Sequence, residues 1–256
     1  MSDGQTQDAA ERVRAAVERT LQAGTARIRQ TMLSPAGPVT ATGTIDFVQR
    51  RATAVMTMPP HPFAPDPNTT TDVTMIIDGV DTYTQVIDRP GRWIVDRLAS
   101  AGQTVSAGDP GLLLDLLRGT VAATSIDDAE AVAAFDVEVD LDRAIERAPD
   151  DLRRPLREVM DTVLRDRTPH QARVHLDGDG RLRSIGIALA TTNQQPVDQL
   201  EVELFDLGAD VEIDLPDAAS ILDQDEMAAL GAELSERFGD ELMTPPAGSD
   251  NDATSP

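Results

Sequence analysis

The fold is decided by the stretch Val73-Thr74-Met75-Ile76-Ile77-Asp78-Gly79-Val80-Asp81-Thr82-Tyr83-Thr84-Gln85-Val86-Ile87-Asp88-Arg89-Pro90-Gly91-Arg92-Trp93-Ile94-Val95. Val73, Met75 and Ile77 share one face of an extended segment, because successive side chains of a strand point to opposite faces. Asp78-Gly79 and Asp88-Arg89-Pro90-Gly91 are turn sequences, so residues 82–87 and 92–95 are predicted to return as the next two strands. The stretch therefore predicts an antiparallel meander.

Segments with the same period-two pattern lie on both sides of this meander. Upstream, residues 44–48 place Ile45 and Phe47 on one face, and residues 53–58 are the expected hairpin partner. Residues 59–67 are rich in proline, which has no amide hydrogen for a strand ladder, so we predict an irregular loop. Downstream we expect a strand at residues 135–141 and two hairpins, formed by residues 174–189 and by residues 201–215 with its turn at Gly208-Ala209.

Helical spacing of apolar residues predicts four helices. Residues 8–32 are predicted to form one long amphipathic helix, with Val13, Val17, Leu21, Ile28 and Met32 on its apolar side. A short leucine-rich helix is expected after Asp109-Pro110, with Asp109 as its N-cap, and it should be buried because its five leucines leave little polar surface. Residues 151–164 predict an amphipathic helix, and Leu230, Leu234 and Phe238 predict an acidic one.

The order of these elements predicts an α+β fold in which helices cover one face of a curved antiparallel sheet. We divide the chain into a domain at residues 1–216, an acidic helical appendage at residues 217–243 and a disordered tail at residues 244–256. The 40 residues from Asp217 onward hold 10 acidic residues and one arginine. We interpret this stretch as a solvated segment rather than a docking tail.

The composition excludes several classes of function. The 256 residues include 22 basic residues, all of them arginine, against 45 acidic ones, so the net charge is −23. A surface this negative repels phosphates and anionic lipid head groups, and we therefore expect no binding to nucleic acid. The absence of cysteine excludes disulfides, thiolate metal sites and a cysteine nucleophile. The sequence contains no run of 18 apolar residues, so we predict no transmembrane helix.

Candidate chemical motifs are few. Asp177-Gly178-Asp179-Gly180 resembles the start of a calcium loop, but Arg181 stands at the next ligand position, so we interpret the motif as a tight hairpin turn. His170 and His175 do not have the spacing of a zinc pair, and His175 is expected to face solvent. Ser184 lies outside any nucleophile-elbow sequence. We therefore predict no catalytic residue, no metal ligand and no cofactor, and we do not expect an enzyme.

Five phrases, in this order, resemble the LolA-like superfamily, and specifically the actinobacterial LppX/LprG-type lipoproteins. The phrases are residues 76–83 followed by Trp93, residues 109–117, residues 137–140, residues 174–183 and residues 204–216. The resemblance covers the chain from about Asp8 to Pro216. It implies a curved antiparallel half-barrel sheet wrapped over a long N-terminal helix, with helical inserts that cover the concave face and an apolar cavity between sheet and helices.

Members of that family hold acyl chains of lipids or lipidated molecules in this cavity. The resemblance therefore implies that residues 1–216 form a lipid-binding domain. A filled core is the alternative for any single apolar residue. The candidate ligand-binding residues are those expected on the concave face: Ile45, Phe47, Val73, Met75, Ile77, Val137, Val139, Ile185, Ile187, Val202 and Leu204.

Two functions remain open on these grounds. The first is a non-catalytic, monomeric carrier or sensor whose partner is a lipid or acylated ligand. The second is a protein-interaction or regulatory module, similar to RseB-type regulators, with a filled or vestigial cavity and a protein partner. The relatives are exported and anchored through a lipidated cysteine, and this sequence shows neither a signal segment nor a cysteine. We expect a cytoplasmic protein if Met1 is the native start, and a cell-envelope or secreted protein if it is not.

Overall fold

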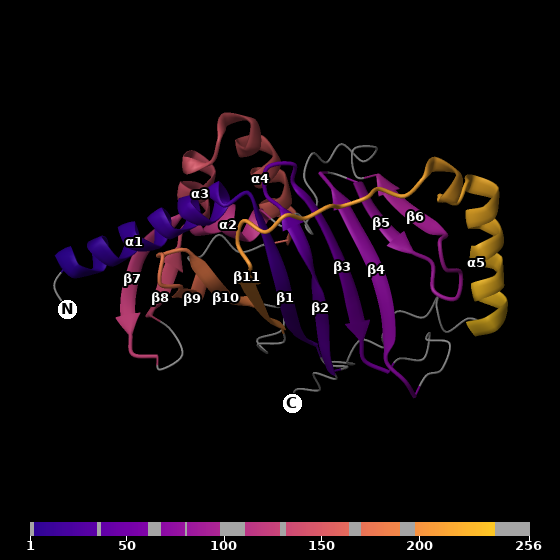
Figure 1. Ribbon diagram of the computed structural model, residues 1–256, viewed down its shortest axis with the longest axis horizontal. Coiled ribbons are helices and arrows are strands. Elements are labelled where there is room, and N and C mark those ends of the chain that lie inside the picture. Colours follow the sequence, from indigo (N-terminus) through magenta and orange to yellow (C-terminus); the bar gives the residue numbers. More distant parts are fainter. Residues whose placement is uncertain are drawn as a thin grey trace, which may run out of the picture.

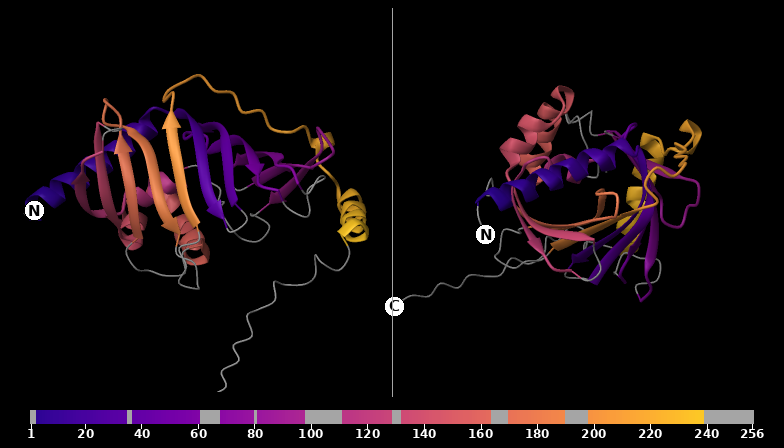
Figure 2. Two further views of the ribbon diagram at one scale, coloured as in Figure 1. Left: turned by 90° about the horizontal axis from the view of Figure 1, so that it is seen from below. Right: turned by 60° about the vertical axis from the view of Figure 1, so that its left-hand side comes forward.

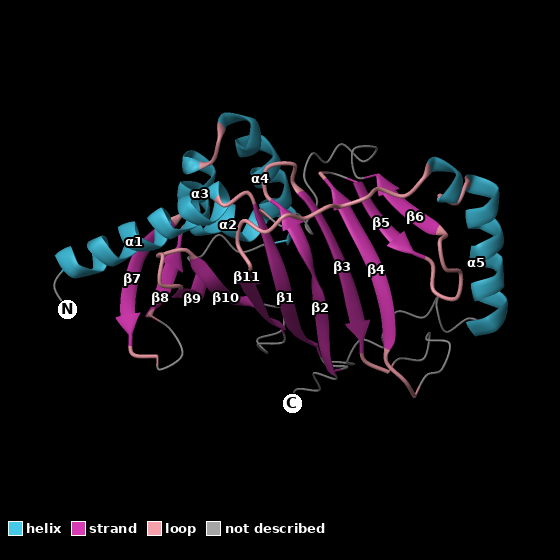
Figure 3. Cartoon of the chain, viewed as in Figure 1, coloured by secondary structure: helices cyan, strands magenta, loops and turns pink. Residues whose placement is uncertain are grey.

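The computed structural model describes residues 3–34, 37–60, 68–79, 81–97, 111–128, 132–163, 170–189 and 198–238. They form one curved antiparallel sheet of 11 strands with helices against its concave side (Figures 1, 2 and 3). The strand order is β6-β5-β4-β3-β2-β1-β11-β10-β9-β8-β7. The strands are β1 (Thr25–Ser34), β2 (Gly37–Asp46), β3 (Arg51–Met58), β4 (Thr71–Asp78), β5 (Asp81–Gln85), β6 (Trp93–Arg97), β7 (Thr120–Ile126), β8 (Ala133–Val139), β9 (His170–Leu176), β10 (Leu182–Leu189) and β11 (Asp198–Phe205).

The helices gather over one half of the sheet. Helix α1 (Asp3–Gln22) crosses the concave side of β7, β8 and β10, and α2 (Leu112–Leu117) packs beside it. Helix α3 (Leu141–Arg147) packs against α2, and α4 (Asp150–Val163) packs against α3. Helix α5 (Gln224–Phe238) lies apart, beside β6. The predicted α+β class with a curved antiparallel sheet and an N-terminal helix is confirmed.

The long helix predicted over residues 8–32 is wrong in its second half. Helix α1 ends at Gln22, and Gly24 has a φ of +80°, a left-handed conformation that glycine adopts without steric cost. Ile28 and Met32 lie instead in β1, which pairs with β2 on one side and with β11 on the other. Apolar residues four apart also fall on one face of a strand, so their spacing alone did not separate the two structures.

The predicted hairpin of residues 201–215 is also wrong. Residues 201–205 belong to β11, which pairs with β10 on one side and with β1 on the other, and residues 209–217 form no strand. After Asp206 and Gly208, both with positive φ, the chain runs across the sheet toward β6 (Figure 1). Helix α3 was not predicted; Asp140, whose side chain accepts a hydrogen bond from the Arg143 amide, is its N-cap.

The other predicted elements are found. The hairpins of β2 with β3 and of β9 with β10 are present, as are the β4–β5–β6 meander, a buried α2 and the helix predicted at residues 151–164. Of the predicted proline-rich loop only Pro59 and Pro60 are among the described residues. Asp109 and Pro110, predicted to start α2, also lie outside them; the described helix follows Gly111.

The acidic segment after β11 packs against the β6 edge of the sheet. Ile221 bridges Trp93 in parallel, and the Leu222 amide donates to the Trp93 carbonyl. Leu222 and Leu230 are buried with Val86, and Ile94 packs against them. Arg89 pairs with Glu233 and Arg92 pairs with Glu226. Residues 221–233 therefore cover an edge strand that would otherwise present unpaired backbone groups.

A close approach of β2 and β3 requires a glycine. A Cβ atom at Gly43 would lie 1.9 Å from the Thr53 carbonyl oxygen and 2.7 Å from the Ala54 Cα. Gly43→Ala should therefore lower the free energy of unfolding by about 1–3 kcal/mol or more, because backbone must move to admit the methyl group. Urea denaturation measures this change. Gly178→Ala is the control, since no atom lies within 4 Å of its new Cβ; equal effects of the two variants would contradict the explanation.

Candidate functional site

The strand register puts the apolar side chains of the sheet on its concave face. One row crosses eight strands, because directly paired residues of antiparallel strands lie on the same face. The row consists of Val73, Met56, Ala41, Gln30, Val202, Ile185, Val174 and Phe135. A second row consists of Met75, Ala54, Gly43, Ile28 and Leu204. The concave face is therefore mostly apolar, with Gln30 as the polar side chain of these two rows, and its two halves are covered differently.

The half under the helices is a packed core. Side chains of α1 and α2, among them Val13, Val17 and Leu117, share one cluster with the strands and are fully buried. Eight of the eleven candidate ligand-binding residues belong to this cluster: Ile45, Phe47, Val137, Val139, Ile185, Ile187, Val202 and Leu204. Each of these eight side chains is less than one tenth exposed, as expected for a filled core. Their contact with a ligand stays a prediction.

The half formed by β1–β4 has a different character. We call its concave side chains the methionine face, which consists of Met32, Val39, Ala41, Met56, Met58, Val73 and Met75. Val73 is buried, but the other six are only half-buried. The main helix contacts of the described chain fall on β7, β8 and β10 rather than on these strands. Val73, Met75 and Ile77, the remaining candidates, lie on this half, and Ile77 borders the core cluster.

The described strands β1–β4 carry no charged side chain at any concave-facing position. The convex face of the same strands carries Arg27, Arg29 and Asp72, which alternate with the concave residues. Arg29 pairs with Glu203 at 2.8 Å, and Thr57 donates to Asp72 at 2.6 Å. The convex face of these described strands also carries Leu33, Val55 and Ile76, but only their concave face is without charged side chains.

Sequence reasoning missed Met32, Met56 and Met58. Met32 was assigned to a helix, so its face on a strand was not considered. Residues 54, 56 and 58 alternate in β3 in the same way as Val73, Met75 and Ile77 in β4, and this alternation was the signal that could have identified the two methionines. Thioether side chains are unbranched and polarizable, so a surface rich in methionine adapts to ligands of varied shape.

A buried ion network joins the two halves. Asp115 on α2 is only 2% exposed, and its carboxylate lies 3.1 Å from Arg50 and 3.2 Å from Arg118. Arg118 also pairs with Glu18 of α1 at 2.6 Å. Arg50 sits in the β2–β3 turn with a φ of +53°. The network therefore fixes α1 and α2 against the turn that precedes β3.

The Asp177–Gly180 turn is built as predicted. Asp177 accepts hydrogen bonds from the amides of Asp179 and Arg181 and from the Arg181 guanidinium, all at 2.9 Å. Among the residues that the structure describes, no group of three or more acidic or histidine side chains is arranged to hold a metal ion. The turn thus acts structurally in the β9–β10 hairpin.

These hydrogen bonds make the hairpin sensitive to acid. Partial burial raises the pKa of Asp177, but the hydrogen bonds from Arg181 and Asp179 outweigh it and leave the pKa below its ordinary value. A lowered pKa stabilises the fold above the unfolded pKa of about 3.9, and this stabilisation is lost as the pH falls through the folded value.

Asp177→Asn, which mimics the protonated side chain, should therefore lower the free energy of unfolding by about 1 kcal/mol at pH 7. The difference from the native chain should shrink as the pH falls through the folded pKa of Asp177, and denaturant titrations at several pH values measure it. Asp179→Asn is the control, because its side chain is 74% exposed. A difference that stays constant with pH would contradict the assignment.

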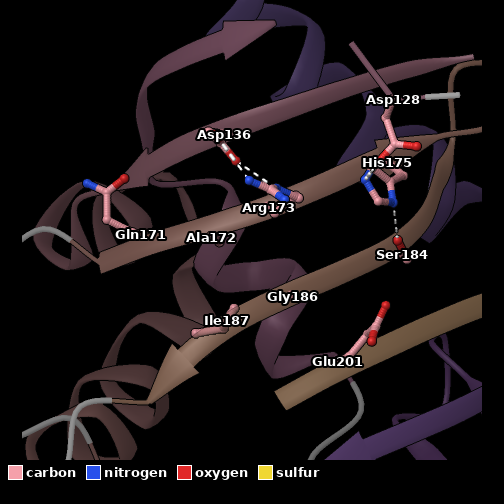
Figure 4. A pocket seen from close by; sticks show the side chains of 10 residues that line it. All are labelled: Asp128, Asp136, Gln171, Ala172, Arg173, His175, Ser184, Gly186, Ile187 and Glu201. Atoms are coloured by element: carbon pink, nitrogen blue, oxygen red, sulfur yellow. Dashed lines mark hydrogen bonds and ion pairs between the residues drawn. The ribbon is translucent and has the colours of Figure 1, made fainter. Parts of the chain in front are cut away.

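The convex face carries a polar hollow of about 580 Å³ between β8, β9, β10 and β11 (Figure 4). Across it, the Ser184 hydroxyl lies 2.8 Å from His175 Nδ1, and Asp128 lies 3.3 Å from His175 Nε2. Arg173 pairs with Asp136 at 2.8 Å along the same face. No sequence motif singles out Ser184 or His175. The hairpin register pairs them directly, and the turn at residues 177–180 was the signal that could have placed them together.

Comparison with known proteins gives structural likenesses only. No family model and no curated protein matches the sequence. The structure is similar to that of LprF from Mycobacterium bovis, with a TM-score of 0.47 and 16% identity over 82% of this chain and 97% of that one. It is also similar to a putative outer membrane lipoprotein-sorting protein domain from Vibrio parahaemolyticus, with a TM-score of 0.30 and 12% identity over 77% of this chain and 92% of that one. An uncharacterized conserved protein from Thermus thermophilus gives a TM-score of 0.38 and 9% identity over 83% of this chain and 98% of that one.

Within the described helices, none is both long and apolar enough to cross a membrane.

Proposed function

We propose that this protein is a carrier or sensor that binds the acyl chains of a lipid, or another apolar ligand, on the methionine face. The observation that supports this is the contrast within one sheet. The β7–β11 half is filled by α1 and α2, which also reach concave residues of β1–β3 such as Ile28 and Ile45, whereas the methionine face is apolar and, except for Val73, only half-buried. An uncharged apolar surface of this kind on a chain of net charge −23 is typical of a binding site.

The chemistry of this face favours acyl chains over polar ligands. Each methylene that leaves water contributes about 0.8 kcal/mol, so ten of them contribute about 8 kcal/mol before the costs of association. A hydrocarbon chain needs no hydrogen-bonding partner. Concave-facing side chains of the described strands β1–β4 offer neither a cation for a phosphate nor a carboxylate for an amine. The ligand is therefore held by its chains and not by its head group.

Titration of the purified protein with a fluorescent fatty acyl probe tests this function. We expect saturable binding with a blue-shifted emission, and we expect organic extraction or native mass spectrometry to find a co-purified lipid. An absence of bound lipid together with an absence of probe uptake would overturn the proposal.

The alternative function is a protein-interaction or regulatory module. Its expected contact surfaces were the proline-rich loop, of which all but Pro59 and Pro60 lie outside the described residues, and the acidic C-terminal segment. The side chains of Glu226 and Glu233 in that segment pair with Arg92 and Arg89 of the same chain, so they are not free for a partner. Pull-downs with the full chain and with residues 217–256 removed test this alternative. A partner retained only by the full chain would favour it over the carrier.

The remaining expectations are parts of this proposal. A carrier of this kind does not turn over a substrate, and we expect it to act as a monomer. We also expect the cellular compartment of the protein to depend on whether Met1 is its native start. Size-exclusion chromatography with light scattering checks whether the protein is a monomer.

A further inference from the structure

A Ser–His–Asp arrangement lies on the convex face, remote from the methionine face. His175 in β9 and Ser184 in β10 are direct cross-strand partners, and Ser184 Oγ lies 2.8 Å from His175 Nδ1. Asp128, just after β7, approaches the other ring nitrogen, with Oδ2 at 3.3 Å from Nε2 (Figure 4). Three separate segments of the chain therefore place a hydroxyl on one side of an imidazole and a carboxylate on the other.

The surroundings of the imidazole fix its tautomer. His175 Nε2 is buried, and although Asp128 is in ion-pair range, the alignment falls short of a hydrogen bond. A carboxylate can only accept, so we assign the proton to Nε2, the ring nitrogen that faces Asp128. Nδ1 then presents its lone pair to Ser184, and the Ser184 hydroxyl donates to it. This is the polarity by which a histidine acts as general base toward a serine nucleophile.

The hollow beside Ser184 has room for a small molecule. Gly186 lies two residues along β10 on the same face as Ser184, between Arg173 of β9 and Glu201 of β11, and it leaves the floor without a side chain. Gln171 and Arg173 are the neutral and cationic hydrogen-bond donors of the lining, and Asp136 holds Arg173 in place. Asp128, Asp136 and Glu201 are its acidic groups.

We propose that Ser184 is a nucleophilic serine that accepts an acyl group from small activated esters. His175 Nδ1 takes the hydroxyl proton as Ser184 Oγ forms a bond to the carbonyl carbon. The bond from that carbon to the leaving oxygen then breaks, and the leaving group takes the proton from His175. The products are an acyl-serine and an alcohol, with no change of oxidation state. Asp128 is a positioning residue, since it acts only through His175.

The reaction is a single acylation and not a turnover. Ile185 and Gly186, which follow Ser184, are paired with both β9 and β11, so their amides are engaged in the sheet and do not offer an oxyanion hole of the kind that accelerates hydrolytic enzymes. This is compatible with a carrier, and the proposal does not depend on lipid binding at the methionine face.

The test incubates the full chain with p-nitrophenyl acetate and measures p-nitrophenolate release, intact mass and the modified peptide. We expect one acetyl group per chain on Ser184. Ser184→Ala should abolish this adduct, and His175→Gln, which keeps a hydrogen-bonding side chain but no base, should slow its formation about 10²-fold. Ser220→Ala is the control, because Ser220 donates only to the Asp217 carbonyl; it should react as the native chain does.

The pH profile separates a chemical role from a structural one. In the native chain the acylation rate should depend on pH, because a general base must be unprotonated to accept the serine proton, and His175→Gln should change this dependence. Acetyl groups spread over several residues, or a profile that His175→Gln leaves unchanged, would overturn the proposal. Peptide mapping of the native chain decides the outcome even if Ser184→Ala fails to fold.

Discussion

Replacing Asp115 by alanine should lower the free energy of unfolding by about 3–5 kcal/mol, the largest effect on stability that we expect from a single substitution. Asp115 is 2% exposed, and it is the carboxylate between the guanidinium groups of Arg50 and Arg118. Its removal leaves two cations close together in a site from which water is largely excluded. The loss is therefore a penalty for uncompensated charge, added to the lost hydrogen bonds.

Equilibrium denaturation by urea measures this change, with the cooperativity of the transition as a check on two-state behaviour. Glu146→Gln is the matched control, because Glu146 pairs with Arg143 on an exposed helical surface, where ion pairs contribute about 1 kcal/mol or less. Similar losses in the two variants would show that Asp115 does not anchor α2. Asp115→Asn, which keeps some hydrogen bonding, should fall between the control and the alanine variant.

Replacing Met56 by aspartate should weaken the binding of a fatty acyl probe by at least about tenfold, the largest effect on binding that we expect. Met56 lies at the centre of the methionine face, in one row with Val73 and Ala41. A carboxylate there must lose its water when a hydrocarbon chain covers it, and no cation of the concave face of the described strands β1–β4 can compensate it. Fluorescence titration of probe with each variant measures the effect.

Val55→Asp is the matched control for this experiment. Val55 is the neighbour of Met56 in β3, points to the convex face and is 41% exposed. The same charge at this position should leave the dissociation constant of the probe nearly unchanged. Thermal unfolding of both variants shows whether either is destabilised enough to lose binding through misfolding. Equal weakening by Val55→Asp and Met56→Asp would contradict the assignment of the site to the concave face.

Much of the sheet could be predicted because its strands alternate in polarity. The turn sequences at residues 78–79, 88–91 and 177–180 set hairpins that depend only on local sequence. The boundary between α1 and β1 could not be predicted from spacing, since Ile28 and Met32 satisfy the helical and the strand period equally well. Residues 25–34 form a strand because they pair with β11, which lies more than 150 residues further along the chain. Such long-range pairing leaves no local signal in the sequence.

The candidate site could be predicted only as a face. All eleven candidate residues were sought on the concave side, and alternation was enough to choose that side. Sequence could not distinguish Val137, which α1 and α2 bury completely, from Met75, which stays half-buried. That difference depends on which strands the helices cover. Asp115 with Arg50 and Arg118 helps to hold α2 in its place over the strands, and these charged residues are not part of any apolar pattern.

We expect an apolar ligand to lie against the concave face of β1–β4. Photo-crosslinking tests it most directly: a fatty acid with a photoactivatable group near its methyl end is bound to the native chain, activated, and located by peptide mass spectrometry. We expect crosslinks on the methionine face, at Met32, Met56, Met58 or Met75, and their loss when unlabelled fatty acid competes. Crosslinks confined to the convex face, or labelling that competition does not reduce, would contradict the claim.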